Sequence, residues 1–397
     1  MKTQRFGVKW KEFRSVLRTE YSHIFHDAGV MLILIFAILI YTTVYALAYK
    51  NQVVRNIPVA VIDHSQTSSS RKLIETFDAE PNIFVSYTPP SMEEAKRLFF
   101  DRKVHGIVYI PHDYEKKLMR GEKAIVGVYV DASYFLMYRQ VFADVVSGVT
   151  GVGGEVEFVR LLASGATIPQ AEATINPVAY GVTNLFNPYG GYGSFVMPAI
   201  IIIIIQQTLL IGIGMIGGTW REFGVYKRLC IPGERRLSTL PVVLGKTVAY
   251  LSIYAVTLSY ILVVHYRWFH YPMNGTFLNI VGFLVPYMLA CIFLGIAIST
   301  LFRYRENSLL FMLWSSIPML MISGASVPKE TIPHWLYEFG KIFPSSSGVE
   351  GFLRIQTMGA SLSDVMAQYG TLWILAGIYL ILACIGIRKV MDKTEKE

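Results

Sequence analysis

Six apolar stretches alternate with polar segments along this chain. They cover residues 28–49, 192–218, 247–264, 277–302, 307–323 and 370–387. At 1.5 Å of rise per residue, each is long enough to cross about 30 Å of hydrocarbon as a helix, although 307–323 is at the lower limit. The pattern predicts a polytopic α-helical membrane protein with six transmembrane helices.

The six stretches share a lack of ionisable side chains: none contains Asp, Glu, Lys, Arg or His. Ionisable groups inside a membrane helix usually mark a proton relay, an ion site or a charge sensor. Their absence from the predicted spans indicates that the chain cannot use an ion gradient by itself. The protein is then either passive or takes its energy from a partner.

The N-terminal segment 1–27 has the period of an amphipathic helix over residues 6–26. Apolar residues recur every three or four positions, and basic residues lie on the other faces: Phe6, Trp10, Phe13, Leu17, Tyr21 and Ile24 against Lys9, Lys11, Arg14 and Arg18. A basic helix with an aromatic stripe tends to lie in the lipid headgroup layer. Two roles stay open: a topological anchor, or a lever that couples a cytoplasmic motor to the first span.

Between the first two spans, residues 50–191 alternate between strand and helix patterns. The pattern predicts strands at 57–62, 83–87, 106–110 and 124–130, and helices at 68–77, 91–100, 111–119 and 134–162, with an interruption of the last helix at Gly148, Gly151, Gly153 and Gly154. Such alternation favours a small sheet covered by helices. The segment is therefore predicted to be an inserted extracytoplasmic α/β domain, long enough to bury its own core.

The remaining residues 192–388 hold spans two to six, and two connecting segments in them stand out. The loop 219–246 is too polar to enter the bilayer. The segment 324–369 is rich in Pro, Gly and Ser but also apolar, which predicts an external re-entrant hairpin of short helices dipping into the outer leaflet.

The distribution of basic residues orients the spans. Eighteen Lys and Arg residues lie in 1–27, 219–246, 303–306 and the tail, whereas the opposite short loops carry four. Because the richer side is cytoplasmic, both termini and the tail 389–397 are predicted to be cytoplasmic. A hydrophobic fraction of 53% and a net charge of +8 distributed in this way indicate a polytopic membrane protein and not a nucleic-acid-binding one.

Several motifs resemble catalytic or ligand sites without meeting their requirements. Gly245-Lys246-Thr247 lacks the glycine that a phosphate-binding loop needs five residues earlier, where Leu240 stands. The adjacent Asp63, His64 and Ser65 do not make a catalytic triad, because triads are assembled in space. The chain is therefore not predicted to be an enzyme or to bind metal.

Gln206 and Gln207 are the most polar side chains of the second span. They either line a substrate path or hydrogen-bond to a neighbouring helix, and the sequence does not decide between these roles.

Four segments in this order resemble the permease subunits of type-2 ABC exporters that carry a large external domain between spans one and two. The first is the external domain, with IPVAVIDHSQTSSSRKLIETF, EEAKRLFF, GIVYIPHDYEKKLMRGE and VGVYVDAS. The second is Asn187-Pro188 before span two. The third and fourth follow spans two and five: Trp220, Arg221, Glu222, Phe223 and Gly224, then Leu229, Pro232, Gly245 and Lys246; and Gly324, Pro328, Pro333, Trp335, Pro344, Arg354 and Gly359.

The resemblance implies that 219–246 contains the coupling helix that docks on a separate cytoplasmic ABC ATPase subunit. Glu222 and Gly224 match that motif, whereas Val225 stands where the family commonly has Thr. Trp10 and Arg14 would offer a second contact beside it. No cofactor is expected on this chain, since ATP and Mg would bind to the partner subunit.

The predicted function is the permease subunit of an ATP-driven exporter that moves an amphipathic or hydrophobic substrate out of the cytoplasm or inner leaflet. A second permease copy or a paralogue is required, because six spans supply half of a pathway. Whether a periplasmic adaptor binds, and whether the substrate is a drug, lipid, peptide or polysaccharide precursor, stays open. The alternatives are a non-transporting receptor or scaffold, an ion-coupled transporter, which the uncharged spans disfavour, and a membrane hydrolase, for which no nucleophile–base pair is found.

Overall fold

The computed structural model describes residues 2–51, 53–178, 181–188, 190–229, 238–325, 327 and 329–396. Two compact units make up the chain. One comprises residues 1–52 and 184–397, and the other comprises Val53–Thr183. Cys230, Pro232, Arg235, Arg236 and Pro328 lie outside the described residues, as does the side chain of Phe6.

The unit Val53–Thr183 is built on a four-stranded mixed sheet with the strand order β2-β1-β3-β4. Strands β2 (Ile83–Tyr87) and β3 (Gly106–Ile110) both run parallel to β1 (Ile57–Asp63). Strand β4 (Gly127–Val130) pairs antiparallel with β3. The four strands lie where the alternating pattern predicts them, although β4 begins three residues late.

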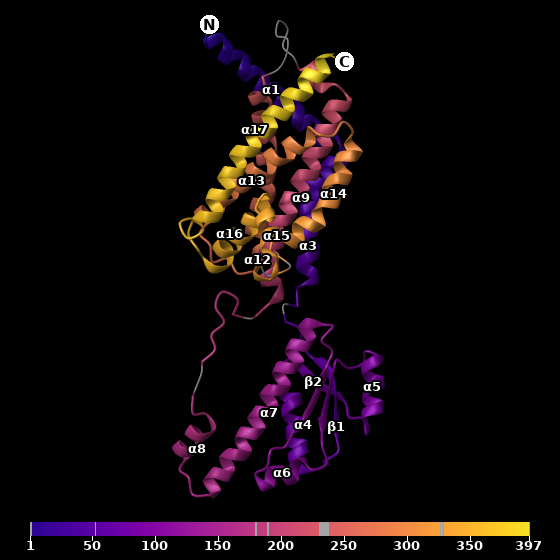
Figure 1. The fold of residues 1–397 in the computed structure, drawn as a ribbon, viewed down its shortest axis with the longest axis vertical. Coiled ribbons are helices and arrows are strands. Elements are labelled where there is room, and N and C mark those ends of the chain that lie inside the picture. The colour runs from indigo at the N-terminus through magenta and orange to yellow at the C-terminus, as the bar shows by residue number, and fades with distance from the viewer. Residues whose placement is uncertain are drawn as a thin grey trace. The chain divides into compact units, whose positions relative to one another are not determined.

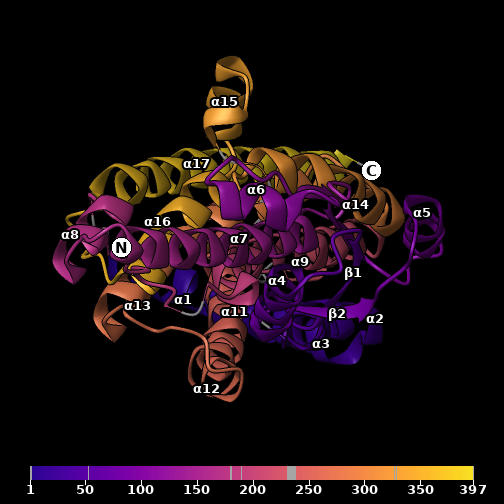
Figure 2. The ribbon, with the colours of Figure 1, turned by 90° about the horizontal axis from the view of Figure 1, so that it is seen from below.

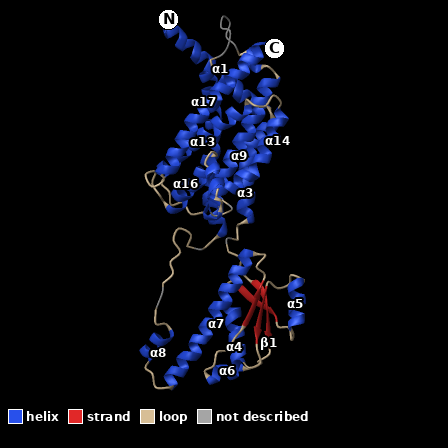
Figure 3. Ribbon diagram, viewed as in Figure 1, coloured by secondary structure: helices blue, strands red, loops and turns tan. Residues whose placement is uncertain are grey.

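Helices cover both faces of this sheet (Figure 3). Helices α4 (Ser68–Ala79) and α7 (Phe135–Ala163) share one core with strands β1, β2 and β3. Helix α5 (Met92–Phe100) packs on the opposite face, against β1 and β3. Two further helices, α6 (Tyr114–Arg120) and α8 (Ile168–Ile175), complete the unit.

The predicted glycine interruption of the long helix is wrong, because α7 is continuous from Phe135 to Ala163. Gly148 has a packing role: a Cβ atom there would lie 2.8 Å from Cδ1 of Phe77 on α4. A Cβ atom added at Gly151 or Gly153 would meet nothing within 4 Å. Gly148 therefore permits close approach to α4, and the glycine-rich stretch does not form a joint.

The other unit is a helical bundle (Figure 1). Five of the described helices are long and apolar enough to cross a membrane: Ala28–Ala48, Tyr192–Glu222, Thr239–Trp268, Phe277–Ser299 and Met366–Lys393. The first of them is made up of α2 (Ala28–Met31), η1 (Leu32–Ala37) and α3 (Ile38–Ala48), and the third of α11 (Thr239–Tyr260), η2 (Ile261–His265) and α12 (Tyr266–Trp268). The second and fourth are α9 (Tyr192–Glu222) and α13 (Phe277–Ser299), and the fifth belongs to α17 (Met366–Lys396).

Helix α9 is the centre of the bundle. It contacts α3, α13, α14 and α16. Of the residues in its most apolar stretch, 83% are buried inside the protein, compared with 28% of those in the corresponding stretch of Ala28–Ala48. A helix that is apolar all round has to be buried by protein or lipid. The apolar side chains that α3 and α17 expose are therefore available for membrane lipid or a second copy.

The fifth predicted span corresponds to α14 (Arg305–Ile322), which contacts α9. Its first turn contains Arg305 and Glu306, and it is not one of the five described helices that are long and apolar enough to cross a membrane. The six-span count therefore stays a prediction.

After α14 come η3 (Lys329–Thr331), α15 (His334–Gly340) and α16 (Pro344–Met358), the short helices expected in the segment 324–369. Helix α16 packs against α9, α13 and α17. In Figure 2, α15 projects beyond α17 at the edge of the bundle. That these helices dip into the outer leaflet of the membrane stays a prediction.

Candidate functional site

At the end of helix α9, the side chains change from buried to exposed within four residues. Trp220 is fully buried, whereas Glu222 is exposed and Phe223 is 59% exposed. Gly224 follows with a φ of +61°, in the left-handed region that suits glycine, and begins the short helix α10 (Val225–Arg228). The sequence thus builds a tight turn that presents a carboxylate and an aromatic ring to the surroundings.

Arg221 fixes this turn to the neighbouring connection. Its guanidinium donates hydrogen bonds to the backbone carbonyl oxygens of Thr300 at 2.9 Å and Phe302 at 2.7 Å. These carbonyls lie just after α13, where a helix end leaves such groups without intrahelical partners. The turn after α9 is therefore attached to the α13–α14 connection.

Helix α1 (Lys2–His26) buries a face that differs from the predicted aromatic stripe. The buried side chains recur at every fourth residue and are Glu12, Val16, Glu20 and Ile24. Trp10 is 55% exposed and stacks on Phe13, with ring centroids 5.2 Å apart, and Arg14 is exposed. The helix uses its acidic and aliphatic face to pack on α11.

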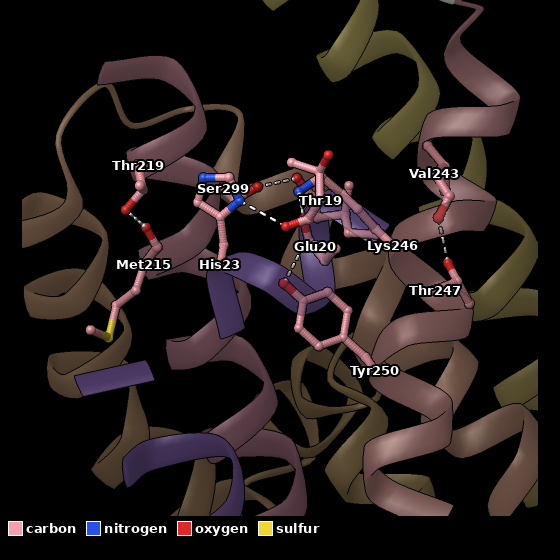
Figure 4. Close-up of polar contacts among 11 residues, drawn as sticks. Thr19, Glu20, His23, Met215, Thr219, Val243, Lys246, Thr247, Tyr250 and Ser299 are labelled. Carbon is pink, nitrogen blue, oxygen red and sulfur yellow. Dashed lines mark hydrogen bonds and ion pairs between the residues drawn. The ribbon is translucent and has the colours of Figure 1, made fainter. Parts of the chain in front are cut away.

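A buried polar cluster lies where α1 meets α11 (Figure 4). Lys246 Nζ is 2.7 Å from Glu20 Oε2, and the Tyr250 hydroxyl donates a hydrogen bond to Glu20 Oε1. Lys246 Nζ also lies 3.7 Å from the centre of the Trp220 ring, a cation–π contact. The cluster joins α1, α9 and α11.

The helix that contains the third apolar stretch is longer than the stretch itself. The helical segment Thr239–Trp268 begins eight residues before the apolar stretch 247–264 and contains Lys246 and His265, both buried. Hydropathy places the boundary at the first run of apolar residues, whereas the helix starts at Ser238, its N-cap. Lys246 is thus a buried residue of this helix, and Glu20 of α1 supplies its counter-charge.

A second ion pair fixes the start of the first span. Asp27 caps α2 by accepting hydrogen bonds from the backbone N–H groups of Gly29 at 3.0 Å and Val30 at 3.1 Å, and it pairs with Arg305 of α14. Burial acts to raise the pKa of the Asp27 carboxyl, but the hydrogen bonds and charge of Arg305 outweigh it, so the pKa lies below its usual value. Asp27 thus stays ionised.

Gln206 and Gln207 both lie in the core of the bundle, and their contacts differ. Gln206 Oε1 accepts a hydrogen bond from the Ser345 backbone N–H at 2.7 Å, and its Nε2 donates to Ser345 Oγ at 3.1 Å. It therefore caps the N-terminus of α16. Gln207 Nε2 lies 3.4 Å from the sulfur of Met319, and its Oε1 is buried without a hydrogen-bond partner among the described residues.

The hairpin residues are distributed over separate elements. Gly324, with a φ of +79°, follows α14, and Pro333 is the N-cap of α15. Trp335 is 71% exposed, Pro344 begins α16 and is buried, and Arg354 is half-buried in α16. These residues are not brought together with the cluster around Trp220 by any described contact.

The structure adds Glu12, Glu20, Asp27 and Tyr250 to the residues that the sequence indicates. The spacing of Glu12, Val16, Glu20 and Ile24 is a signal that could have identified the buried face of α1, since side chains four apart lie on one face. The pairing of Glu20 with Lys246 spans 226 residues, and no local pattern indicates it.

The comparisons with known proteins agree with this architecture. Residues 28–385 match the family described as ABC-2 family transporter protein. The probable multidrug ABC transporter permease YbhR of Escherichia coli K12 is 22% identical over 359 residues, which cover 90% of this chain and 92% of that protein.

Two further relatives cover the chain to different extents. The inner membrane transport permease YhhJ of Escherichia coli K12 is 22% identical over 403 residues, 97% of both chains. ABC transporter G family member 20 of Dictyostelium discoideum is 23% identical over 207 residues, 52% of this chain and 27% of that protein.

Proposed function

This chain belongs to the ABC-2 transporter family, and from this premise we propose that it is the permease subunit of an ATP-driven exporter. The family and the relatives make it a transport permease, a multi-pass membrane protein that works with an ABC ATPase subunit. The further elements proposed are the direction of transport, the substrate and the docking site.

The observation that carries the docking site is the turn after α9. It presents exposed Phe223 and Glu222 while Trp220 and Arg221 hold it from within. Exposed aromatic rings on a rigid support are typical of binding hot spots. Trp10 and Arg14, which are exposed on α1, are proposed as a second contact, and this side would be cytoplasmic by the positive-inside rule.

The transport cycle then follows from the connections of this turn. Closure of the ATPase would displace the turn together with α9, and α9 contacts α3, α13, α14 and α16. Rigid-body rocking of two such bundles opens a path between them. The second bundle is another copy of this chain or a paralogue.

The substrate proposed is amphipathic or hydrophobic and leaves the cytoplasm or the inner leaflet. The relative named as a probable multidrug permease supports this class. The membrane is the bacterial inner membrane, with both termini cytoplasmic, six spans and the Val53–Thr183 unit outside. There the α/β unit would be accessible to a periplasmic adaptor.

The docking surface is tested by replacing Phe223 with alanine and co-purifying the full chain with its co-encoded ABC ATPase. We expect the affinity for the ATPase to fall roughly tenfold, as for an aromatic interface residue. The matched control is Phe100→Ala, which removes an 80% exposed ring from the α/β unit and should leave binding unchanged. If both variants bind the ATPase equally well, the docking site lies elsewhere on the chain. If the unaltered chain binds no ATPase, a receptor or scaffold is favoured over a permease.

A further inference from the structure

The tripeptide Gly245-Lys246-Thr247, which resembles the end of a phosphate-binding loop, has a structural role at the contact between α11 and α1. A Cβ atom at Gly245 would lie 2.9 Å from Val16 Cγ1 and 3.1 Å from the backbone oxygen of Phe13. The glycine therefore lets α11 approach the backbone of α1. The next residue, Lys246, then reaches Glu20 one turn further along α1.

This ion pair is isolated from water. The exposed fractions of the Lys246 and Glu20 side chains are 4% and 0%, and both carboxylate oxygens of Glu20 are occupied, one by Lys246 and one by Tyr250. Buried ion pairs recover little more than the cost of desolvating them, and apolar residues of similar volume often stabilise a fold as well. Stability alone therefore does not account for this pair.

The pair also contacts the end of α9. Lys246 Nζ lies over the Trp220 ring, and the Trp220 ring packs edge-on against Tyr226 of α10, with centroids 5.1 Å apart. The exposed Glu222 and Phe223 lie between Trp220 and Tyr226 in the sequence. One cluster thus holds α1, α11 and both sides of the exposed turn.

We propose that the Glu20–Lys246 pair is a positioning lock that makes α1, α11 and the segment Trp220–Leu229 move as one body when the ATPase acts. This inference rests on the proposed function for its driving force. It assigns Glu20 and Lys246 to the transmission of movement and not to binding of substrate or ATPase.

The decisive variant replaces both charges, Glu20→Gln with Lys246→Met, because it leaves no unpaired charge buried. A purely structural pair would be dispensable in this variant. The matched control, Asp113→Asn with Lys117→Met, removes a surface pair in the α/β unit with the same N–O distance of 2.7 Å. Tyr250→Phe is a milder second variant, since it keeps the ring and removes the hydrogen bond to Glu20.

The first measurement is hydrogen–deuterium exchange of the full chain alone in lipid nanodiscs. We expect the amides of residues 9–26 to exchange roughly tenfold faster in the double variant and several-fold faster in Tyr250→Phe, with wild-type rates in the control. Wild-type exchange of α1 in the double variant would overturn the lock.

The second measurement repeats the exchange on the complex with the co-encoded ATPase, with and without vanadate trapping. In the wild type, trapping should change exchange in Trp220–Leu229, α1 and α11 together. In the double variant, only Trp220–Leu229 should respond, and a response of all three would overturn the proposal. If the wild-type chain binds no ATPase, the proposed function fails and the transmission role fails with it, while the first measurement still decides whether the lock exists.

Discussion

Replacing Lys246 with methionine is expected to lower the free energy of unfolding by about 3–5 kcal/mol, because Glu20 would remain buried without its counter-charge. Glu20 is fully buried, and only the Tyr250 hydroxyl would still bind its carboxylate. The cation–π contact with Trp220 would also be lost. Denaturant or thermal unfolding of the full chain in detergent measures the change.

Two controls identify the cause of this loss. Lys389→Met removes an exposed lysine from α17 and should change stability by less than about 0.5 kcal/mol. Adding Glu20→Gln to Lys246→Met removes the unpaired charge and should recover most of the loss. A Lys246→Met protein as stable as the wild type would show that the pair is not buried as described.

Replacing Gly218 with alanine is expected to separate α9 from the start of α14. The new Cβ atom would lie 2.7 Å from the Cα and 2.8 Å from the backbone N of Arg305, and neither atom can move without shifting α14. Overpacking of this kind costs about 1–3 kcal/mol, which outweighs the gain of up to about 1 kcal/mol from the better helix propensity of alanine. Because Arg305 pairs with Asp27, the start of the first span should loosen as well.

The matched control is Gly377→Ala in α17, where nothing lies within 4 Å of the added atom. This variant gains helix propensity without a clash, so its melting temperature should equal or exceed that of the wild type. Gly218→Ala should melt lower than both. Equal melting temperatures for the two variants would contradict the close approach of α9 and α14.

Periodicity and hydropathy predict much of this fold. The strands of the α/β unit follow from the alternation of strand and helix patterns along residues 50–191. The long apolar runs at 192–218 and 277–302 correspond to α9 and α13. These signals are local, so one segment is enough to show them. The turn Glu222-Phe223-Gly224 is likewise visible as a motif.

What the sequence does not show depends on partners distant in the chain. The neighbours of Lys246 assign it to a polar loop, whereas the structure places it in α11, paired with Glu20, which lies 226 residues away. From the sequence alone, Gly148 indicates a break in the helix. In the structure, the ring of Phe77 on α4 lies so close that only a small residue fits there. Gln206 cannot be assigned to a path or to a contact until Ser345 is placed beside it. In each case the residue type is explained by a tertiary contact and not by its neighbours.

The most direct test of the central claim, that a separate ATPase drives this chain, is the ATP hydrolysis rate of the co-encoded ABC ATPase in lipid vesicles with and without the full chain. The account predicts that the chain changes this rate several-fold, and that Phe223→Ala abolishes most of the change. An ATPase that binds no permease and hydrolyses ATP at one rate in both preparations would contradict the account.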